Sequence, residues 1–239
     1  MHEQHHKWYS QYLNRDMEML VFGSGGQPVI LFPTEQGRYF DAKDFGIIGS
    51  LENYINEGKV KIYCPDSFDS ESWYNYNIQP EERVQRHLAF EKAILNDVIE
   101  FAYFDSSATK VGVCGLSFGG YHALNIALKY PVKVNSVIIV GGFFDIKRFI
   151  FGYYDDNCYF NNPVDFVPNL NDDWYLEKIK AMKIIFSTGS LDPSKDENIA
   201  MNSLFNSKQI KSILDLHQDY GHDWHWWRDM IPGCFARIV

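Results

Sequence analysis

Residues 110–131, KVGVCGLSFGGYHALNIALKYP, place a serine between an apolar strand and an apolar helix. The run 110–115 has the short, valine-rich character of a buried strand, and residues 120–130 are predicted to form a helix that Pro131 stops. The pattern Gly-x-Ser-x-Gly stands between them, with Ser117 at its centre. The pattern is weak by itself, but at a strand-to-helix turn it is typical of a nucleophilic serine.

A serine on such a turn is held in a strained backbone conformation, with its hydroxyl exposed at the start of the helix. Gly115 and Gly119 are expected because side chains there would collide with the neighbouring strand and helix. The backbone N–H of Phe118 should point to where an oxyanion forms. The alternative is an ordinary glycine-rich turn such as a phosphate-binding loop. The residues disfavour it, because no Gly-Lys-[Ser/Thr] follows and the G-x-G-x-x-G spacing is absent.

Apolar strands and amphipathic helices alternate along the rest of the chain, which predicts an α/β fold with a mainly parallel sheet covered on both faces. The first two strands, joined by the glycine-rich SGGQ, are expected to form an antiparallel hairpin at the edge of the sheet. The predicted strands are 17–23, 28–33, 60–64, 110–115, 134–142, 182–189 and 212–218, and the predicted helices are 44–58, 80–104, 120–130, 198–208 and 223–231.

Residues from about 143 to 180 interrupt this alternation. They are aromatic, rich in Asn and Asp, and poor in strand signals. For this reason we interpret them as an insertion over the carboxyl edge of the sheet. Binding residues often lie on such segments. The 239 residues are therefore predicted to form a single domain, 1–239, rather than two.

A serine hydroxyl needs a base, and in this fold type the acid and then the histidine follow the serine along the chain. Asp192 lies just past the predicted strand 182–189 and is the preferred acid. Asp196 stands four residues further on, where Glu197 and a helix follow at once. Asp196 therefore fits a helix cap better than a catalytic role.

The region after the last predicted strand contains three histidines. His222 follows Gly221 on a loop beyond that strand, which is where a catalytic histidine is expected. His217 still belongs to the strand end, and His225 falls in a tryptophan-rich helix start. A metal site made by His222 and His225 would need a third ligand, so it is disfavoured. We predict no metal and no cofactor.

The loop TEQGRYF after the strand 28–33 should supply a second oxyanion donor through a backbone amide, from Thr34 or Glu35. A backbone donor has no side-chain signature, so the two remain alternatives. The candidate substrate-binding side chains near the same sheet edge are Arg38, Trp73, Tyr74 and Trp224. For the aromatic ones, packing in the core or in loops is the competing interpretation.

Composition bounds the class of partner. The formal net charge is −9 and no run of Lys or Arg occurs, so nucleic acid and anionic membranes are not expected partners. No apolar run is long enough for a transmembrane helix, and the start of the chain has no apolar signal core, which predicts a cytoplasmic protein. The four cysteines are scattered and read as buried, reduced thiols.

Three of these segments together resemble the esterase family of α/β-hydrolases that includes S-formylglutathione hydrolases, feruloyl esterases, enterochelin esterases and mycolyltransferases. GLSFGGYHALNIALKYP is similar to its nucleophile segment, STGSLD to its acid segment, and GHDWHWWRD to its histidine segment, at His222 and Trp226. The resemblance implies an α/β-hydrolase fold and the triad Ser117, Asp192 and His222. The usual His-Gly after the first long strand is replaced by FPTEQG, which departs from the family pattern.

The reaction expected from these residues is hydrolysis of a carboxylic ester or thioester of a small molecule through an acyl-enzyme. Acyl transfer by the same triad differs only in the acceptor, so the sequence does not separate the two. A hydrolase fold kept only for binding is a third alternative. The exposed aromatic residues of the insertion are also suited to a contact between copies of the chain.

Overall fold

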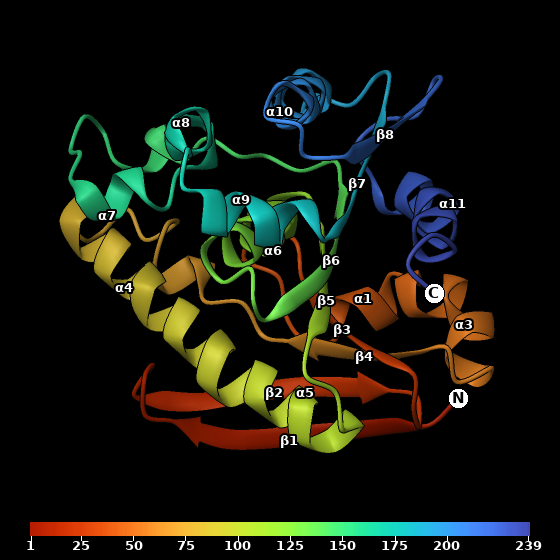
Figure 1. Ribbon diagram of the computed structural model, residues 1–239. Coiled ribbons are helices and arrows are strands. Elements are labelled where there is room, and N and C mark those ends of the chain that lie inside the picture. The colour runs from red at the N-terminus through yellow and green to blue at the C-terminus, as the bar shows by residue number, and fades with distance from the viewer.

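The computed structural model describes residues 1–239 and contains one eight-stranded sheet in the order β1-β2-β4-β3-β5-β6-β7-β8 (Figure 1). Strands β3 to β8 run parallel to one another, and β1 and β2 form the antiparallel edge. This confirms the predicted fold class. The strands are β1 Glu3–Ser10, β2 Arg15–Phe22, β3 Gln27–Phe32, β4 Val60–Pro65, β5 Val111–Leu116, β6 Val134–Val140, β7 Lys183–Gly189 and β8 Ser212–His217.

The edge hairpin has different partners from those predicted. Strand β2 pairs with β1, which the sequence did not signal, and β2 and β3 are separated by β4. Strand β1 is polar and alternates exposed and half-buried residues, as suits a strand at an edge. Strand β3 is almost wholly buried and needs parallel neighbours on both sides. The glycine turn therefore crosses the start of β4, where a Cβ on Gly26 would lie 2.4 Å from the Gly58 carbonyl oxygen.

Helices cover both faces of the sheet because its strands present apolar side chains alternately to each face. Ile30 and Phe32 join the core beneath α4, α5, α6 and α10, whereas Val29 and Leu31 join the core beneath α1 to α3 and α11. Figure 1 shows α4 and α6 on one side of the strands and α3 and α11 on the other. The helices are α1 Asp41–Asp44, α2 Ile47–Ser50, α3 Glu52–Asn56, α4 Pro80–Ala93, α5 Glu100–Ser106, α6 Phe118–Lys129, α7 Asp156–Tyr159, α8 Pro163–Asn169, α9 Asp173–Lys180, α10 Lys195–Ser207 and α11 Trp224–Phe235.

Several predicted helices are divided in the structure. The predicted helix 44–58 is two short helices, α2 and α3, which follow the short α1. The predicted helix 80–104 continues from α4 through a π-helical turn at Ile94–Ile99 into α5. Between β6 and β7 the chain forms only short helices and loops, with a 3₁₀ turn at Lys147–Phe149. None of the helices is both long and apolar enough to cross a membrane. The four cysteines are buried and free, as predicted.

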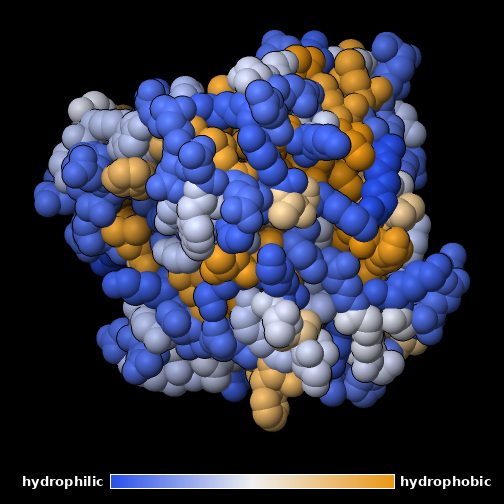
Figure 2. Space-filling view, viewed as in Figure 1, coloured by the Kyte–Doolittle hydropathy of each residue, from blue (hydrophilic) through white to orange (hydrophobic).

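The surface seen in Figure 2 is mostly hydrophilic, with hydrophobic residues reaching it in separate patches. Large apolar side chains that are exposed in the region between β6 and β7 include Phe151, Tyr154, Phe160 and Trp174. The region therefore carries aromatic residues both in the interior and at the surface.

Candidate active site

Ser117 occupies the turn between β5 and α6 with φ 54° and ψ −124°. A positive φ is costly for a residue with a side chain, so the surrounding contacts must hold it. Its N–H donates to the Val140 carbonyl at 2.9 Å, and its own carbonyl accepts the Gly120 N–H at 2.9 Å. The backbone of Ser117 is thus fixed to the neighbouring strand β6 and to the first turn of α6.

The two glycines around Ser117 allow close contact between backbones. A Cβ on Gly115 would lie 1.9 Å from the Gly119 carbonyl oxygen, and a Cβ on Gly119 would lie 2.3 Å from the Pro33 carbonyl oxygen. Neither site can accept a side chain without movement of the backbone, as the sequence predicted. The second contact also shows that the first turn of α6 touches the end of β3, where the TEQGRYF loop begins.

Three side chains from distant parts of the chain meet beside this turn. The Nε2 atom of His222 lies 2.9 Å from Ser117 Oγ, and its Nδ1 atom lies 3.0 Å from each carboxylate oxygen of Asp192. Asp192 follows the end of β7, and His222 lies between β8 and α11. Ser117, Asp192 and His222 therefore form a continuous hydrogen-bonded chain at the carboxyl edge of the sheet.

Asp192 is buried, and its carboxylate accepts hydrogen bonds from other groups besides His222. Its Oδ1 also accepts from the Ser194 N–H at 2.8 Å and the Ser194 hydroxyl at 2.7 Å. Burial raises the pKa of Asp192, but the hydrogen bonds from His222 and Ser194 outweigh it, so the pKa of this carboxyl lies below its ordinary value. The carboxylate is therefore charged at neutral pH and can orient the imidazole.

Gly141, at the end of β6, is a site residue that the sequence analysis missed. It has φ +59°, and a Cβ there would lie 2.8 Å from Asp192 Oδ2 and 3.1 Å from His222 Nδ1. The missing side chain leaves the space in which the acid and the histidine meet. A glycine in "VGGFF" carries no signal of this role, because the contact forms only when β6 and β7 lie side by side.

Aromatic rings enclose His222 on two sides. Trp227 meets it edge to face with ring centroids 4.8 Å apart, and Phe143 meets it at 5.5 Å. The tryptophan of the histidine segment was expected at Trp226. In the structure Trp226 packs on Tyr220 with ring centroids 4.4 Å apart, and Trp227, one residue further along α11, faces the imidazole.

The alternative candidates lie elsewhere. The Asp196 side chain is 90% exposed, in the first turn of α10. His217 lies 3.1 Å from the Ser187 hydroxyl, and the exposed His225 lies 3.7 Å from Asp223 and packs on Trp226. The geometry therefore separates Asp192 and His222 from the residues that competed with them.

The loop after β3 has two backbone amides without a protein acceptor, those of Thr34 and Glu35. The next four amides are all used. Gln36 donates to Asp69, Gly37 to the Thr34 carbonyl, Arg38 to Asp41 and Tyr39 to Asp66. Thr34 is half-buried and Glu35 is exposed, so both amides can donate to a ligand or to solvent beside the α6 turn. Phe118, the first residue of α6, likewise has no carbonyl partner within its helix.

The four candidate substrate-binding side chains have different surroundings. Trp73 was predicted wrongly, because it is completely buried and packs on Tyr121 and Phe149. For Trp73 the competing interpretation, packing in the core, is therefore the correct one. Tyr74 stands next to Phe118 with ring centroids 5.4 Å apart. It is the candidate that lies beside the Ser117 turn.

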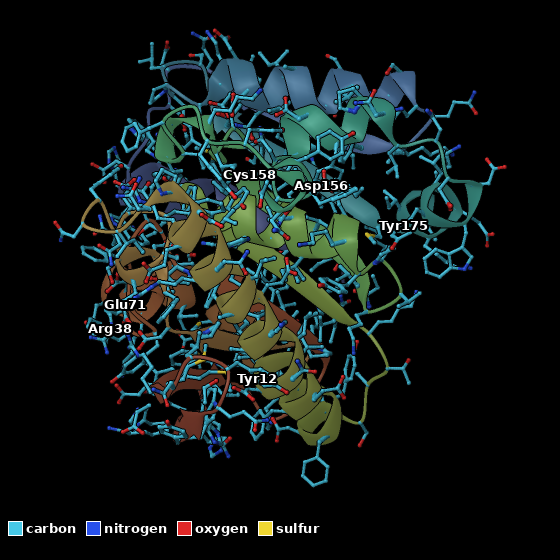
Figure 3. All side chains as sticks on the ribbon, turned by 90° about the vertical axis from the view of Figure 1, so that its left-hand side faces the viewer. Tyr12, Arg38, Glu71, Asp156, Cys158 and Tyr175 are labelled. Atoms are coloured by element: carbon cyan, nitrogen blue, oxygen red, sulfur yellow. The ribbon has the colours of Figure 1, made fainter.

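The other two candidates are tied to surface elements. Arg38 donates to Asp66 at 2.7 Å and lies at the surface (Figure 3). Its guanidinium is therefore already neutralised. Trp224 stacks on Phe45 with centroids 4.4 Å apart and packs on Trp227, so it reaches the histidine only through that second ring.

Arg148 is the unpredicted cation near the site. Its guanidinium lies over the rings of Phe149 at 4.7 Å, Phe143 at 5.3 Å and Phe118 at 6.0 Å. It donates to the Tyr74 hydroxyl at 3.1 Å and forms no ion pair. Because Phe118 follows the serine and Phe143 touches His222, Arg148 stands close to the triad. The sequence did not indicate this position, because a single Arg in an aromatic segment is not part of any recognisable motif.

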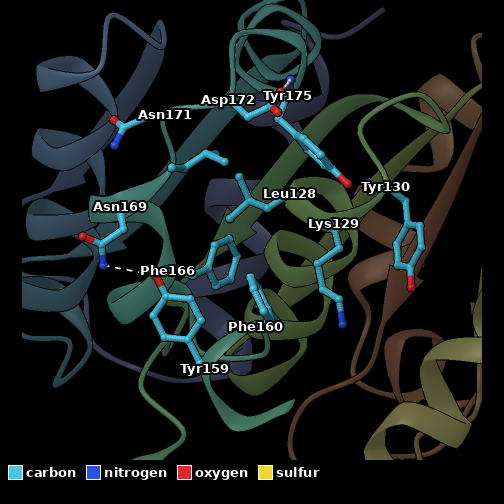
Figure 4. Close-up of a pocket in the computed structure, with 11 residues that line it drawn as sticks. Leu128, Lys129, Tyr130, Tyr159, Phe160, Phe166, Asn169, Asn171, Asp172 and Tyr175 are labelled. Atoms are coloured by element: carbon cyan, nitrogen blue, oxygen red, sulfur yellow. Dashed lines mark hydrogen bonds between the residues drawn. The ribbon is translucent and has the colours of Figure 1, made fainter. Parts of the chain in front are cut away.

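A cavity of about 550 Å³ lies away from the triad, at the other end of α6 (Figure 4). Leu128, Tyr159, Phe160 and Tyr175 are among its walls. Leu128 is eleven residues beyond Ser117, which is about 16 Å along a helix. None of the triad residues lines this cavity, so it is separate from the candidate active site.

Comparison with known proteins shows the family to which the chain belongs. The sequence model of the family described as "Putative esterase" matches residues 10–238. The chain belongs to this esterase family. No curated protein sequence matches significantly. Esterases of this family are hydrolases, and the chain is therefore assigned to that broad class.

Solved structures similar to this one come from several such enzymes. A ferulic acid esterase superposes with a TM-score of 0.80 at 13% identity, over 99% of this chain and 97% of the other. An S-formylglutathione hydrolase from Agrobacterium tumefaciens superposes with a TM-score of 0.73 at 13% identity, over 98% and 94%. A fluorophosphonate-binding serine hydrolase from Staphylococcus aureus gives 0.68 at 14% identity, over 99% and 98%. At these identities the likeness establishes the α/β-hydrolase fold.

Proposed function

We propose that the protein is a serine esterase that hydrolyses a carboxylic ester or thioester of a small molecule through an acyl-enzyme. The observation that carries this proposal is the chain of hydrogen bonds from Ser117 Oγ to His222 and from His222 to Asp192. A hydroxyl, an imidazole and a buried carboxylate in that order are the groups that general-base activation of a serine requires.

In the acylation step His222 Nε2 accepts the proton of Ser117 while Oγ bonds to the ester carbonyl carbon. The imidazolium then gives that proton to the leaving alcohol or thiol as the carbon–oxygen or carbon–sulfur bond breaks. Water repeats the sequence on the acyl-serine and releases the carboxylic acid. Asp192 stays ionised, fixes the tautomer of His222 and stabilises its charged form. The reaction consumes one water and needs no cofactor.

The negative oxygen of the tetrahedral intermediate needs donors that are already in place. The Phe118 N–H at the start of α6 is the first, aided by the positive end of the helix. The unpaired amides of Thr34 and Glu35 are the candidates for the second, because the adjoining Pro33 carbonyl touches the first turn of α6. Both donors are backbone groups, so no side chain has to be ionised for this role.

The side chains around the triad favour an ester with an aromatic or apolar part. Phe143, which meets His222, and Tyr74, which packs on the buried Phe118, are half-buried aromatic side chains near the serine, and the exposed Arg148 adds one cation beside them. The solved relatives named as a ferulic acid esterase and an S-formylglutathione hydrolase suggest two chemical series to test, hydroxycinnamate esters and acyl thioesters. A panel of test substrates should pair neutral aryl esters with matched esters that carry a carboxylate. A lower KM for the charged member of a pair would indicate that Arg148 binds the carboxylate.

The decisive experiment measures hydrolysis of p-nitrophenyl and hydroxycinnamate esters by the wild type and by Ser117→Ala. Removal of the nucleophile should lower kcat by about 10³-fold or more, and should abolish labelling by a fluorophosphonate probe. Ser190→Ala is the matched control, since its hydroxyl only accepts the Asp219 N–H outside the triad. Equal activity in wild type and Ser117→Ala would refute the proposal.

Two further measurements distinguish the alternative functions. Product analysis with added alcohols separates hydrolysis from acyl transfer. A folded protein that the fluorophosphonate probe never labels would favour a binding role.

A further inference from the structure

The segment 66–74, DSFDSESWY, follows the carboxyl end of β4 and runs beside the loop 33–39. We refer to residues 66–74 as the brace segment. Its side chains make hydrogen bonds to several successive residues of that loop. The Ser67 hydroxyl donates to the Gly37 carbonyl at 2.7 Å, and Asp66 accepts the Tyr39 N–H at 3.1 Å.

Asp69 is the central contact of the brace segment. Its side chain has no exposed surface, and its Oδ2 accepts the Gln36 N–H at 3.1 Å. Gln36 has φ 54°, a left-handed conformation that a non-glycine residue rarely keeps without support. The carboxylate therefore fixes the one strained residue of the loop, directly after the unpaired amides of Thr34 and Glu35.

The same carboxylate also contacts the nucleophile helix. Asp69 Oδ1 lies 2.8 Å from Nε2 of His122, which is buried on α6 five residues beyond Ser117. Phe118 packs on His122 edge to face, with ring centroids 5.1 Å apart. One buried acid thus joins the loop with the free amides to the helix that carries the serine and the Phe118 amide.

A second link holds the loop from its outer side. The Tyr74 hydroxyl donates to the Glu35 carboxylate, and Arg148 donates to the Tyr74 oxygen. Tyr74 also packs on Phe118. Both links therefore connect residues 35 and 36 to the residue that follows the nucleophile.

Resting on the proposed esterase function, we propose that Asp69, through His122, is a positioning residue for the oxyanion hole. It holds the Thr34 and Glu35 amides at a fixed place relative to the Phe118 amide, and Tyr74 assists from the other side. Such preorganisation matters more for the transition state than for substrate binding, because charge appears on the oxygen only as the serine attacks.

The first test is Asp69→Ala, which removes both acceptors. The expected result is a fall in kcat of about 10²-fold with KM changed less than about 3-fold, by analogy with the loss of one oxyanion donor. Binding of a boronic acid that forms a tetrahedral adduct on Ser117 should weaken by a similar factor. A residue that only stabilises the fold would not move these two quantities together.

Asp105→Ala is the matched control. Asp105 accepts from the Tyr63 hydroxyl at 2.8 Å and pairs with Lys61 at 2.6 Å, at the amino end of β4 and away from the triad. We expect this variant to lower the melting temperature and to leave kcat and boronic acid affinity unchanged. The pair of variants separates the loss of a hydrogen-bonded, half-buried carboxylate elsewhere in the fold from the loss of Asp69.

Asp69→Asn and Tyr74→Phe keep the test decisive if Asp69→Ala fails to fold. An asparagine can accept the Gln36 N–H with its oxygen and donate to a neutral His122 with its nitrogen, so it should keep at least about a third of wild-type kcat. Tyr74→Phe removes only a partly exposed hydroxyl, and should lower kcat by about 3- to 10-fold with unchanged KM.

Wild-type kcat and boronic acid affinity in folded Asp69→Ala would overturn the inference, as would a change confined to KM. If Asp69→Ala does not fold, unchanged kcat in Tyr74→Phe would do the same. These outcomes differ from a failure of the esterase proposal itself. In that case the wild type hydrolyses no ester of the panel, or Ser117→Ala remains active.

Discussion

The turn that carries Ser117 and the loop that carries the free amides lie side by side but are held in different ways. The turn is fixed by steric contact, since Gly115 and Gly119 bring backbone against backbone. The loop is fixed by side-chain hydrogen bonds, above all that from Gln36 to Asp69. The difference teaches that one half of the site is encoded in five adjacent residues, whereas the other half depends on partners far away in the sequence.

The triad itself should give the largest effect, because it is common to both halves. Asp192→Asn keeps the shape of the acid but can no longer hold the imidazole in the required tautomer, so kcat should fall by about 10³- to 10⁴-fold. Steady-state kinetics on the best ester of the panel measures this. Asp196→Asn, at the exposed start of α10, is the control. A loss below about 10-fold would remove Asp192 from the triad.

The same variant has a predicted pH signature in stability. Because the pKa of Asp192 is lowered in the folded protein, the charged carboxylate adds to the free energy of unfolding above the pH where an unfolded aspartate titrates, about 3.9. This contribution disappears as the pH falls through the lower, folded pKa. The stability gap between wild type and Asp192→Asn should therefore be widest near neutrality and narrow below about pH 4, as urea unfolding at several pH values would show. A constant gap would contradict it.

Gly115→Ala tests the steric contact that fixes the Ser117 turn. The added methyl group meets the Gly119 carbonyl oxygen at 1.9 Å, and the backbone of α6 must move to make room. We expect a loss of about 3 kcal/mol or more in the free energy of unfolding, with activity falling at the same time. Gly25→Ala is the control, since open space surrounds that position. Equal denaturation midpoints would show that the contact is not tight.

Gly141→Ala tests whether space between the acid and the histidine matters apart from the Ser117 turn. The new methyl group would press on Asp192 Oδ2, and φ +59° is unfavourable for alanine. We expect about 1–2 kcal/mol of destabilisation and a fall in kcat of about 10-fold or more. A stability loss with full kcat would mean that the Asp192–His222 pair tolerates displacement.

Gln36→Gly should have the smallest effect on stability and kcat, and it tests the loop that is held by side-chain hydrogen bonds. Glycine accepts the left-handed conformation without strain but makes the unfolded chain more flexible, so the two terms nearly cancel within about 1 kcal/mol. With the Asp69 contact retained, kcat should stay within about 3-fold of wild type. Combined with Asp69→Ala, the flexible residue should lower kcat further than the single change does. If the double variant has the same kcat as Asp69→Ala alone, the backbone conformation of Gln36 has no influence on catalysis.

The comparison also explains which features the sequence could predict. Ser117, Asp192 and His222 each stand just past an apolar strand, and parallel strands end at one edge of a sheet, so their convergence follows from the order of elements. The flanking glycines follow from the local turn. Strand β1 was missed because a polar edge strand lacks the apolar run that marks a buried one.

The supporting residues could not be found in this way. Asp69 reads as one acid among several in a polar loop, and its contacts with Gln36 and His122 span 33 and 53 positions. Trp73 and Tyr74 are adjacent, yet one is in the core and the other faces the nucleophile turn. Which of two neighbouring aromatics faces outward depends on how the loop packs, and no periodicity in a short loop reveals that.

The contact between Gly119 and the Pro33 carbonyl has a consequence for engineering the enzyme. Ser117 and the proposed oxyanion donors share one rigid junction of main chain, so substitutions there should alter chemistry and folding together. The aromatic residues and Arg148 between β6 and β7 belong to a different stretch of chain. Grafting from a relative the part of that stretch that leaves Gly141, Phe143 and the Arg148–Tyr74 hydrogen bond in place is therefore a practical route to a new ester preference.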